Sequence, residues 1–377
     1  MKQISRRQLL LGGGALLGAS YMPGFVRGAW AADIAQPAHM IRADKNENPY
    51  GPSRVALQAI SEAMDLTNKY GVGHSRELVQ LLADMNNVPA DHVLLASGSG
   101  EILKTGGLMA SWDKGSVVCA DPTYHGLVRY AGRAGAEIIR VKVDENLGGD
   151  LVAMHNAIRA DTAMVYLVNP NNPTPTVFKN DELRDFVLDV ARERMVFVDE
   201  AYFEYVEDPD YSSLIDLVAA GHRNIIVART ASKIHGLAGL RVGFGFAHPD
   251  HIAEIKGLKT GGNNVLGVEA AYASYQDTDF QDFTRRKSRE SMAIVEEMLE
   301  ELGVRYIKSQ TNFTFFETGI PADELNAELR EYGIISGRPF PPFTNWSRIS
   351  MAKPEEMRYY VQTFKKLFAH RIKDSAA

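Results

Sequence analysis

The stretch around Lys233 combines a possible nucleophile with groups that could bind a phosphate. Lys233 follows Asn224–Ala228, a short apolar run typical of a buried strand, so we expect it on the loop at the carboxyl end of that strand. Such loops bind ligands in open α/β sheets. Thr230, Ser232 and Arg241 supply two hydroxyl groups and a planar cation suited to a phosphate. A lysine there is a solvated side chain, a counter-charge or, when unprotonated, a former of a Schiff base with a carbonyl group.

A glycine-rich turn, Ser97–Glu101, is the second candidate phosphate site. It follows an apolar run and precedes a helical pattern, so its backbone amides would open a helix and attract an anion. A dinucleotide fingerprint and a P-loop each need a glycine at the position of Leu103, so the turn matches neither motif. It either binds a phosphate or caps an ordinary helix.

Other polar and aromatic side chains follow further apolar runs. Asp199 could bind a metal, cap a strand in solvent, or keep a pyridine nitrogen protonated, which would give pyridoxal 5'-phosphate (PLP) its electron-sink character. PLP carries both a phosphate and an aldehyde. Tyr202 could donate to the phenolic oxygen of that ring, Asn172 offers an amide, and Tyr124 either stacks on a planar ring or fills the core.

Several other chemistries find little support in the sequence. Of the ten histidines, His248 and His251 flank Pro249-Asp250 without a third ligand nearby, and His-Glu-x-x-His is absent, so we expect no metal site. The single cysteine, Cys119, lies in an apolar run and is expected in the core. A net charge of -6 without a basic patch gives no reason to expect nucleic-acid binding.

The order of the apolar patterns predicts an α/β protein. Between His92 and Phe246, continuous apolar strands alternate with amphipathic helices, which indicates a mostly parallel sheet covered on both faces. From Asp277 onward, longer helices with few strands predict a smaller α+β domain. We predict a signal at 1–31, an N-terminal segment joining the small domain at 32–65, a large domain at 66–276 and a small domain at 277–377.

The N-terminus has the pattern of an export signal. Arg6 and Arg7 precede an uncharged apolar run to Val26, and Ala29-Trp30-Ala31 resembles a cleavage site, which predicts twin-arginine export to the periplasm. The alternatives are an uncleaved signal that anchors the chain in the membrane and a buried helix. No stable membrane span is expected in the mature protein.

Six motifs together resemble the PLP-dependent class I/II aminotransferases, with the closest resemblance to the histidinol-phosphate aminotransferase group. The resemblance covers nearly everything after about residue 40 and is carried by order and spacing rather than by one motif. The motifs are Asn46-Glu-Asn-Pro-Tyr50, Ser97-Gly-Ser-Gly-Glu101, Asp121-Pro-Thr-Tyr124, Asn169-Pro-Asn-Asn-Pro-Thr174, Asp199-Glu-Ala-Tyr202 and the run from Ser232-Lys233 to Arg241.

The resemblance implies a fold-type-I PLP-dependent transferase with a mostly parallel, seven-stranded sheet in the large domain, and a homodimer with shared active sites. It implies that Lys233 holds PLP as a Schiff base and moves the proton of the substrate. It further implies cofactor contacts from Ser99, Gly100, Glu101, Tyr124, Asn172, Asp199, Tyr202, Thr230, Ser232 and Arg241, with Tyr70 reaching in from a second subunit. The implied substrate contacts are Arg348, Asn48, Tyr50 and Arg338.

Two departures from the family pattern concern the substrate. Pro175 stands where the family usually has glycine, and the loop 337–343 is unusually rich in proline and aromatic residues near Arg348. The sequence therefore predicts amino transfer between an L-amino acid, or a histidinol-phosphate-like amine, and a 2-oxo acid. The alternatives are a PLP-dependent lyase, decarboxylase or racemase on the same scaffold, and a protein that holds PLP for binding or regulation.

Overall fold

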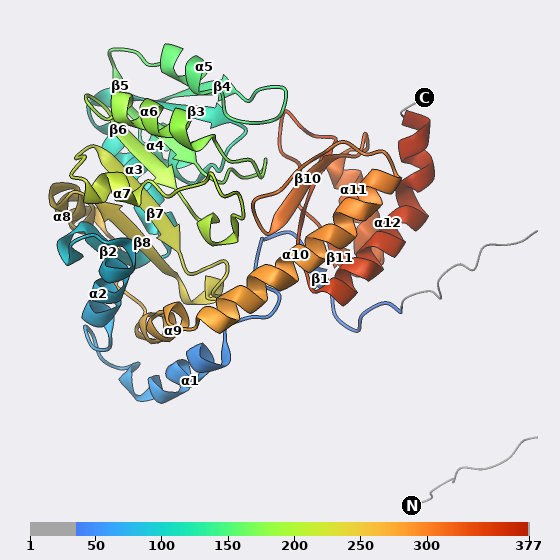
Figure 1. Cartoon of the computed structure of the whole chain (residues 1–377), viewed down its shortest axis with the longest axis horizontal. Coiled ribbons are helices and arrows are strands. Elements are labelled where there is room, and N and C mark those ends of the chain that lie inside the picture. The colour runs from blue at the N-terminus through green and yellow to red at the C-terminus, as the bar shows by residue number, and fades with distance from the viewer. Residues whose placement is uncertain (1–34, 376–377) are drawn as a thin grey trace, which may run out of the picture. The chain divides into compact units, whose positions relative to one another are not determined.

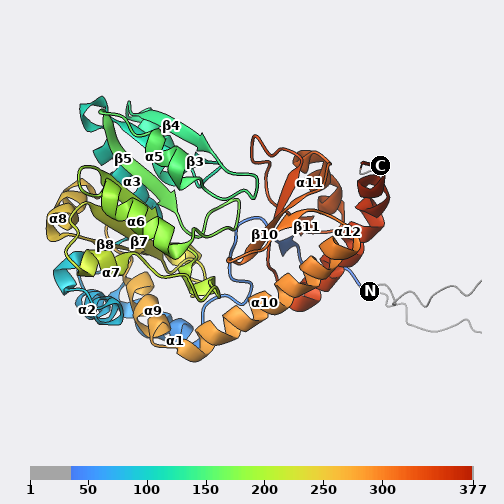
Figure 2. The ribbon, with the colours of Figure 1, turned by 45° about the horizontal axis from the view of Figure 1, so that its top comes forward.

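The computed structural model describes residues 35–375, which belong to one compact unit. The predicted signal at 1–31 lies outside the described residues. No helix within the described range is long and apolar enough to cross a membrane. Figures 1 and 2 show a large sheet flanked by helices and, beside it, a smaller sheet packed on helices α10 and α12.

The large sheet has seven strands in the order β2-β8-β7-β6-β5-β3-β4. β8 is antiparallel to both of its neighbours, and the other neighbouring pairs are parallel, which confirms the predicted mostly parallel sheet. The strands are β2 (Val93–Ser97), β3 (Ser116–Asp121), β4 (Glu137–Lys142), β5 (Thr162–Val168), β6 (Met195–Asp199), β7 (Ile225–Thr230) and β8 (Val242–Ala247).

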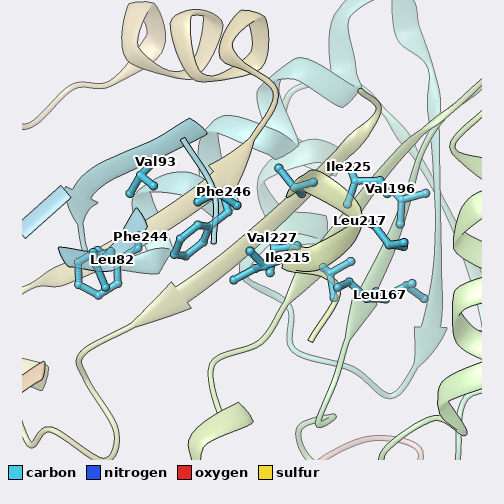
Figure 3. Packing of buried hydrophobic residues seen from close by; sticks show 14 of the residues in the cluster. Leu82, Val93, Leu167, Val196, Ile215, Leu217, Ile225, Val227, Phe244 and Phe246 are labelled. Carbon is cyan, nitrogen blue, oxygen red and sulfur yellow. The ribbon is translucent and has the colours of Figure 1, made fainter. Parts of the chain in front are cut away.

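Both faces of this sheet are buried, because successive strand residues point to opposite sides and both kinds are apolar. In β7, Ile225 and Val227 pack on one face and Ile226 and Ala228 on the other. Figure 3 shows the first face, where side chains of several strands meet those of α2 and α7. Cys119 is buried in β3, as predicted.

Different helices cover the two faces of the large sheet. Residues of α2 (Ser75–Asn86), α5 (Leu151–Asn156), α6 (Asn180–Val190), α7 (Ile215–Ala219) and α9 (Val265–Tyr275) join the core on one face. Residues of α3 (Ser99–Ser111), α4 (Gly126–Arg133) and α8 (Pro249–Leu258) join the core on the other. α1 (Arg54–Glu62) begins after Ser53, whose hydroxyl accepts the Ala56 amide as an N-cap.

The smaller sheet is antiparallel, in the order β12-β10-β9, and has its own apolar core. Near it, β1 pairs in parallel with β11, which joins the segment after residue 40 to the C-terminal part of the chain. The predicted domain bounds, 32–65, 66–276 and 277–377, stay predictions. The elements are β1 (Ile41–Arg42), α10 (Thr278–Glu301), β9 (Tyr306–Ile307), β10 (Phe313–Glu317), α11 (Ala322–Glu331), β11 (Ile334–Ile335), β12 (Trp346–Ser350) and α12 (Pro354–Ser375).

Candidate active site

The predicted site residues of the large sheet gather at one edge. The parallel strands β3, β5, β6 and β7 end there, and β2 and β8 meet at the same edge because Ser97 pairs with Val242. Thr230 pairs with Gly243, so the loop that carries Lys233 begins beside the start of β8. The topology therefore brings together segments that are more than 100 residues apart in the sequence.

The turn between β2 and α3 is shaped to hold an anion. Gly98 has φ +78, and a Cβ on it would collide with the guanidinium of Arg241, so only glycine allows that cation to lie against the turn. A Cβ on Gly243 would likewise collide with the Ser99 amide nitrogen. The amides of Ser99 and Gly100 begin the helix, where N–H groups lack partners within the helix and the dipole is positive.

Two hydroxyl groups lie at the end of β7, where Thr230 pairs with Gly243 of β8. The Ser232 amide donates to Thr230 Oγ1 at 3.1 Å, and the two hydroxyl oxygens lie 2.8 Å apart. Glu101 is used differently, because its carboxylate accepts the amides of Ser97 at 2.8 Å and Gly261 at 3.0 Å. Its own amide donates to the Gly98 carbonyl at 3.1 Å, so Glu101 braces the turn in this structure.

Lys233 lies beneath the N-terminal strap, by which we mean residues 41–50. Its Nζ donates to the carbonyls of Lys45 at 3.3 Å and Asn46 at 3.2 Å. The same Nζ lies 5.2 Å from the ring centroid of Tyr202. The lysine is thus held at the sheet edge by the strap rather than released into solvent.

Asp199 is a carboxyl group in an apolar setting, 2% exposed at the end of β6. Burial raises its pKa to about 7, against the opposing effects of the Ala201 amide and of Lys233, while Glu200 raises it further. The Ala201 amide donates to Asp199 Oδ1 at 3.1 Å. A buried carboxyl that resists ionisation is suited to a cationic partner, such as a protonated ring nitrogen.

Tyr124 lies close enough to this carboxyl and to Tyr202 to be affected by their charges. Asn172 Nδ2 donates to Tyr202 Oη at 3.3 Å. Burial raises the pKa of Tyr124, and the nearby charges of Asp199 and Tyr202 add to that rise. Tyr124 is 44% exposed, which leaves its ring accessible to a ligand.

Arg348 lies in β12 of the small sheet and reaches the edge of the large one. Its Nη1 donates to Asn172 Oδ1 at 2.7 Å and its Nη2 to the Asp44 carbonyl at 2.6 Å, while the buried Nε has no partner among the described residues. Burial lowers the pKa of Arg348 to about 10. Phe340 lies between two guanidinium groups, 4.9 Å from that of Arg348 and 4.3 Å from that of Arg338.

Asn48, Tyr50 and Tyr70 were also predicted to contact the cofactor or the substrate, and the single chain gives each a different environment. Asn48 is buried, and its Nδ2 donates to the Ile234 carbonyl at 2.7 Å, so it holds the loop of Lys233. Tyr50 packs edge-on against Phe283 with ring centroids 4.9 Å apart. Tyr70 is fully exposed and makes no contact with the predicted cofactor site among residues 35–375.

Three buried residues of this region were absent from the sequence-based site. Asn46 donates from Nδ2 to Tyr202 Oη at 2.8 Å, and Ser350 donates to Asn46 Oδ1 at 2.6 Å. Asn312 donates to the Asn46 carbonyl at 3.2 Å. Asn46 does lie in the first of the six motifs, but its spacing alone reveals no partner.

Comparisons with known proteins agree with this geometry. The profile of the family aminotransferase class I and II matches residues 38–364. The histidinol-phosphate aminotransferase of Symbiobacterium thermophilum is 34% identical over 333 residues, which cover 86% of this chain and 90% of that protein. Histidinol-phosphate aminotransferase 2 of Pseudomonas fluorescens is 34% identical over 93% of this chain and 95% of its own length.

The chain belongs to the class I and II aminotransferases. It is therefore a PLP-dependent enzyme, which confirms the predicted family, enzyme class and cofactor. A crystal structure from Erwinia carotovora atroseptica, provisionally named histidinol-phosphate aminotransferase, has a TM-score of 0.85 at 34% identity over 88% of this chain and 97% of that one. The Sinorhizobium meliloti histidinol-phosphate aminotransferase, solved with PLP, has a TM-score of 0.80 at 24% identity over 94% and 99% of the two chains and supports the fold.

The residues present fit PLP. The glycine turn with Arg241, Thr230 and Ser232 matches a phosphate. The buried Asp199 matches a cationic ring nitrogen, and Lys233 matches an aldehyde. These three requirements are met at one edge of one sheet.

Proposed function

We propose that this aminotransferase moves an amino group between an L-amino acid, or a histidinol-phosphate-like amine, and a 2-oxo acid, with Lys233 as the catalytic residue. The observation that carries the proposal is that Lys233 lies over Tyr202, whose hydroxyl bonds Asn172 and through it Arg348, while Lys233 is close enough to Asp199 to lower the pKa of that buried carboxyl. When bound, PLP supplies an aldehyde carbon and a ring that withdraws electrons from the substrate.

Each residue then has a distinct task. Lys233 would hold the aldehyde carbon of the cofactor and would carry a proton to and from the substrate carbon through Nζ. Asp199 would keep the ring nitrogen protonated, and Tyr202 with Asn172 would bind the phenolic oxygen. Arg348 offers two parallel N–H groups to a carboxylate or phosphate of the substrate, exchanging its contacts with Asn172 and Asp44 for that anion.

The surroundings of Arg348 favour a substrate with a second anionic group. Arg129 and Arg338 lie near enough to lower the pKa of His125, after burial and Arg140. Burial lowers the pKa of Arg338, and Arg129 adds to that effect. This cluster of like charges has no acidic side chain bonded to Arg338 in the described residues. A phosphate or a second carboxylate on the substrate would neutralise it.

The test is a panel of L-amino acids and histidinol phosphate, each incubated with a 2-oxo acid and read by mass spectrometry for the new amino acid. Transfer to the 2-oxo acid, with the cofactor passing to its amine form, supports the proposal. Carbon dioxide, ammonia or a D-amino acid as the main product would instead favour decarboxylation, elimination or racemisation. A bound cofactor without any product over hours would favour a binding or regulatory protein.

A lysine variant tests the catalytic role directly. Lys233→Ala should lower kcat by roughly 10²–10⁴-fold or more, because the proton carrier is lost. Borohydride reduction of the wild type should leave the cofactor on the peptide that contains Lys233. Lys287→Ala, on the surface of α10, is the matched control and should retain both properties.

The fully exposed Tyr70 supports a homodimer in which each subunit completes the phosphate site of the other. Co-expression of Lys233→Ala and Tyr70→Ala chains tests it. Mixed dimers would contain one intact site, so activity should recover to about a quarter of wild type, given random pairing of equal amounts. Recovery to no more than the level of the two separate variants would contradict shared sites.

We also propose export through the twin-arginine route, with cleavage after Ala31, on the basis of residues 1–31. The full chain should reach the periplasm with Ala32 as its first residue. Replacing Arg6 and Arg7 by lysine should retain the chain in the cytoplasm. A chain that fractionates with the membrane at full length would instead indicate an anchor.

A further inference from the structure

We infer that Asn46 is a positioning residue that orients the hydroxyl hydrogen of Tyr202 toward the phenolic oxygen of the cofactor. The inference deepens the proposed function and rests on it. Asn46 is 1% exposed and lies in the left-handed region, with φ +54, a conformation that asparagine tolerates better than most residues. Its side chain connects the small sheet with the cofactor edge of the large one.

The hydrogen bonds fix which way the Asn46 amide points. The Asn46 backbone N–H donates to Ser350 Oγ at 2.8 Å, so the single hydrogen of that hydroxyl is free to donate elsewhere. It donates to Asn46 Oδ1 at 2.6 Å. With Oδ1 facing Ser350, Nδ2 faces Tyr202 Oη, 2.8 Å away.

Tyr202 Oη consequently accepts two N–H groups, from Asn46 at 2.8 Å and from Asn172 at 3.3 Å. A phenol group can both accept and donate hydrogen bonds, and it has a single hydrogen to donate. Because both asparagines present N–H groups to this oxygen, the hydroxyl hydrogen must point at a third group. The accepted bonds also polarise the hydroxyl and make it a stronger donor to an anionic oxygen.

The decisive experiment is a double-mutant cycle of Asn46→Gly with Tyr202→Phe in the cofactor-bound enzyme. Glycine keeps the backbone conformation and removes the amide. In the wild-type background, Asn46→Gly should raise the dissociation constant for PLP about three- to tenfold. It should also raise the pH midpoint of the visible absorbance of the bound cofactor by a few tenths to about one pH unit, because a weaker donor stabilises the phenolate less.

In the Tyr202→Phe background, both effects of Asn46→Gly should largely disappear. Equal changes in the two backgrounds would overturn the inference, since a residue that only holds the strap acts whether or not the hydroxyl is present. No change in either background would overturn it as well. Asn87→Gly, which replaces another left-handed asparagine at the end of α2, is the matched control and should alter neither measurement.

A second variant covers the case in which Asn46→Gly does not fold. Ser350→Ala removes the hydroxyl that orients the amide, and it should move the affinity for PLP and the pH midpoint in the same direction by less. A shift in the opposite direction would contradict the inference. If the wild type neither binds PLP nor transfers amino groups, the proposed function fails; if it does both and the cycle is additive, only the role of Asn46 fails.

Discussion

Replacing Asp199 by asparagine should make the cofactor-free protein more stable at neutral pH while it impairs the enzyme. The carboxyl lies 2% exposed at the sheet edge, and burial raises its pKa from 3.8 to about 7. Ionisation of Asp199 therefore costs free energy in the folded chain that it does not cost in the unfolded chain. Asparagine keeps an oxygen for the Ala201 amide and never ionises.

The pH window follows from the direction of the shift. Below about pH 4 the carboxyl is protonated in both states. Between pH 4 and 7 the folded chain keeps a proton that the unfolded chain has lost, so the free energy of unfolding falls as the pH rises. The fall ends near pH 7, where folded Asp199 also ionises, and its full size is on the order of 4 kcal/mol.

Urea unfolding of cofactor-free wild type and Asp199→Asn, at intervals from pH 4 to pH 8, measures this difference. The advantage of the variant should grow across that window and then level off, and Asp65→Asn on the exposed turn after α1 controls for the loss of one carboxylate. Bound PLP should reduce the effect in the wild type, because a protonated ring nitrogen favours the carboxylate. A difference that is constant with pH, or that shrinks as the pH rises, would refute the reasoning.

Three further substitutions follow from the contacts. Arg348→Lys loses the bidentate fork and should raise the KM for the anionic substrate by about ten- to a hundredfold in steady-state assays, with smaller effects on cofactor absorbance. Glu200→Gln leaves the buried Arg229 without its carboxylate and should lower the free energy of unfolding by about 3–5 kcal/mol, measured in urea. Glu269→Ala removes the carboxylate that accepts the amide at the start of α2. This change should weaken PLP binding, because the loop that carries Tyr70 adjoins the start of α2. The free energy of unfolding should fall comparatively little.

Much of the site could be predicted because apolar runs locate strand ends. Each of Tyr124, Asn172, Asp199 and Lys233 follows such a run, and parallel strands bring their carboxyl ends to one edge. Arg241 directly precedes β8 and has the left-handed conformation, with φ +59. Neither this conformation nor the contact of the Arg241 guanidinium with Gly98 can be deduced from local hydropathy.

Other features of the structure leave no pattern in the sequence from which they could be predicted. α9 has buried residues on most sides, including Glu269, so it lacks the single apolar stripe that predicts a surface helix. β1 and β11 contain two residues each and pair across nearly 300 positions. Asn46 depends on Tyr202 and Ser350, which lie 156 and 304 residues further along the chain. Such roles are set by tertiary contacts rather than by spacing.

The N-terminal strap makes the cofactor site depend on both sheets. Asn46 bonds Ser350 of the small sheet with one end of its amide and Tyr202 of the large sheet with the other. Hydrogen bonds weaken steeply once the donor and acceptor separate beyond about 3.5 Å. A displacement of one sheet against the other by about one ångström would therefore break one of these bonds. Because Arg348 lies two residues before Ser350 in β12, we expect an anion bound by Arg348 to act also on the hydrogen bonds at Tyr202.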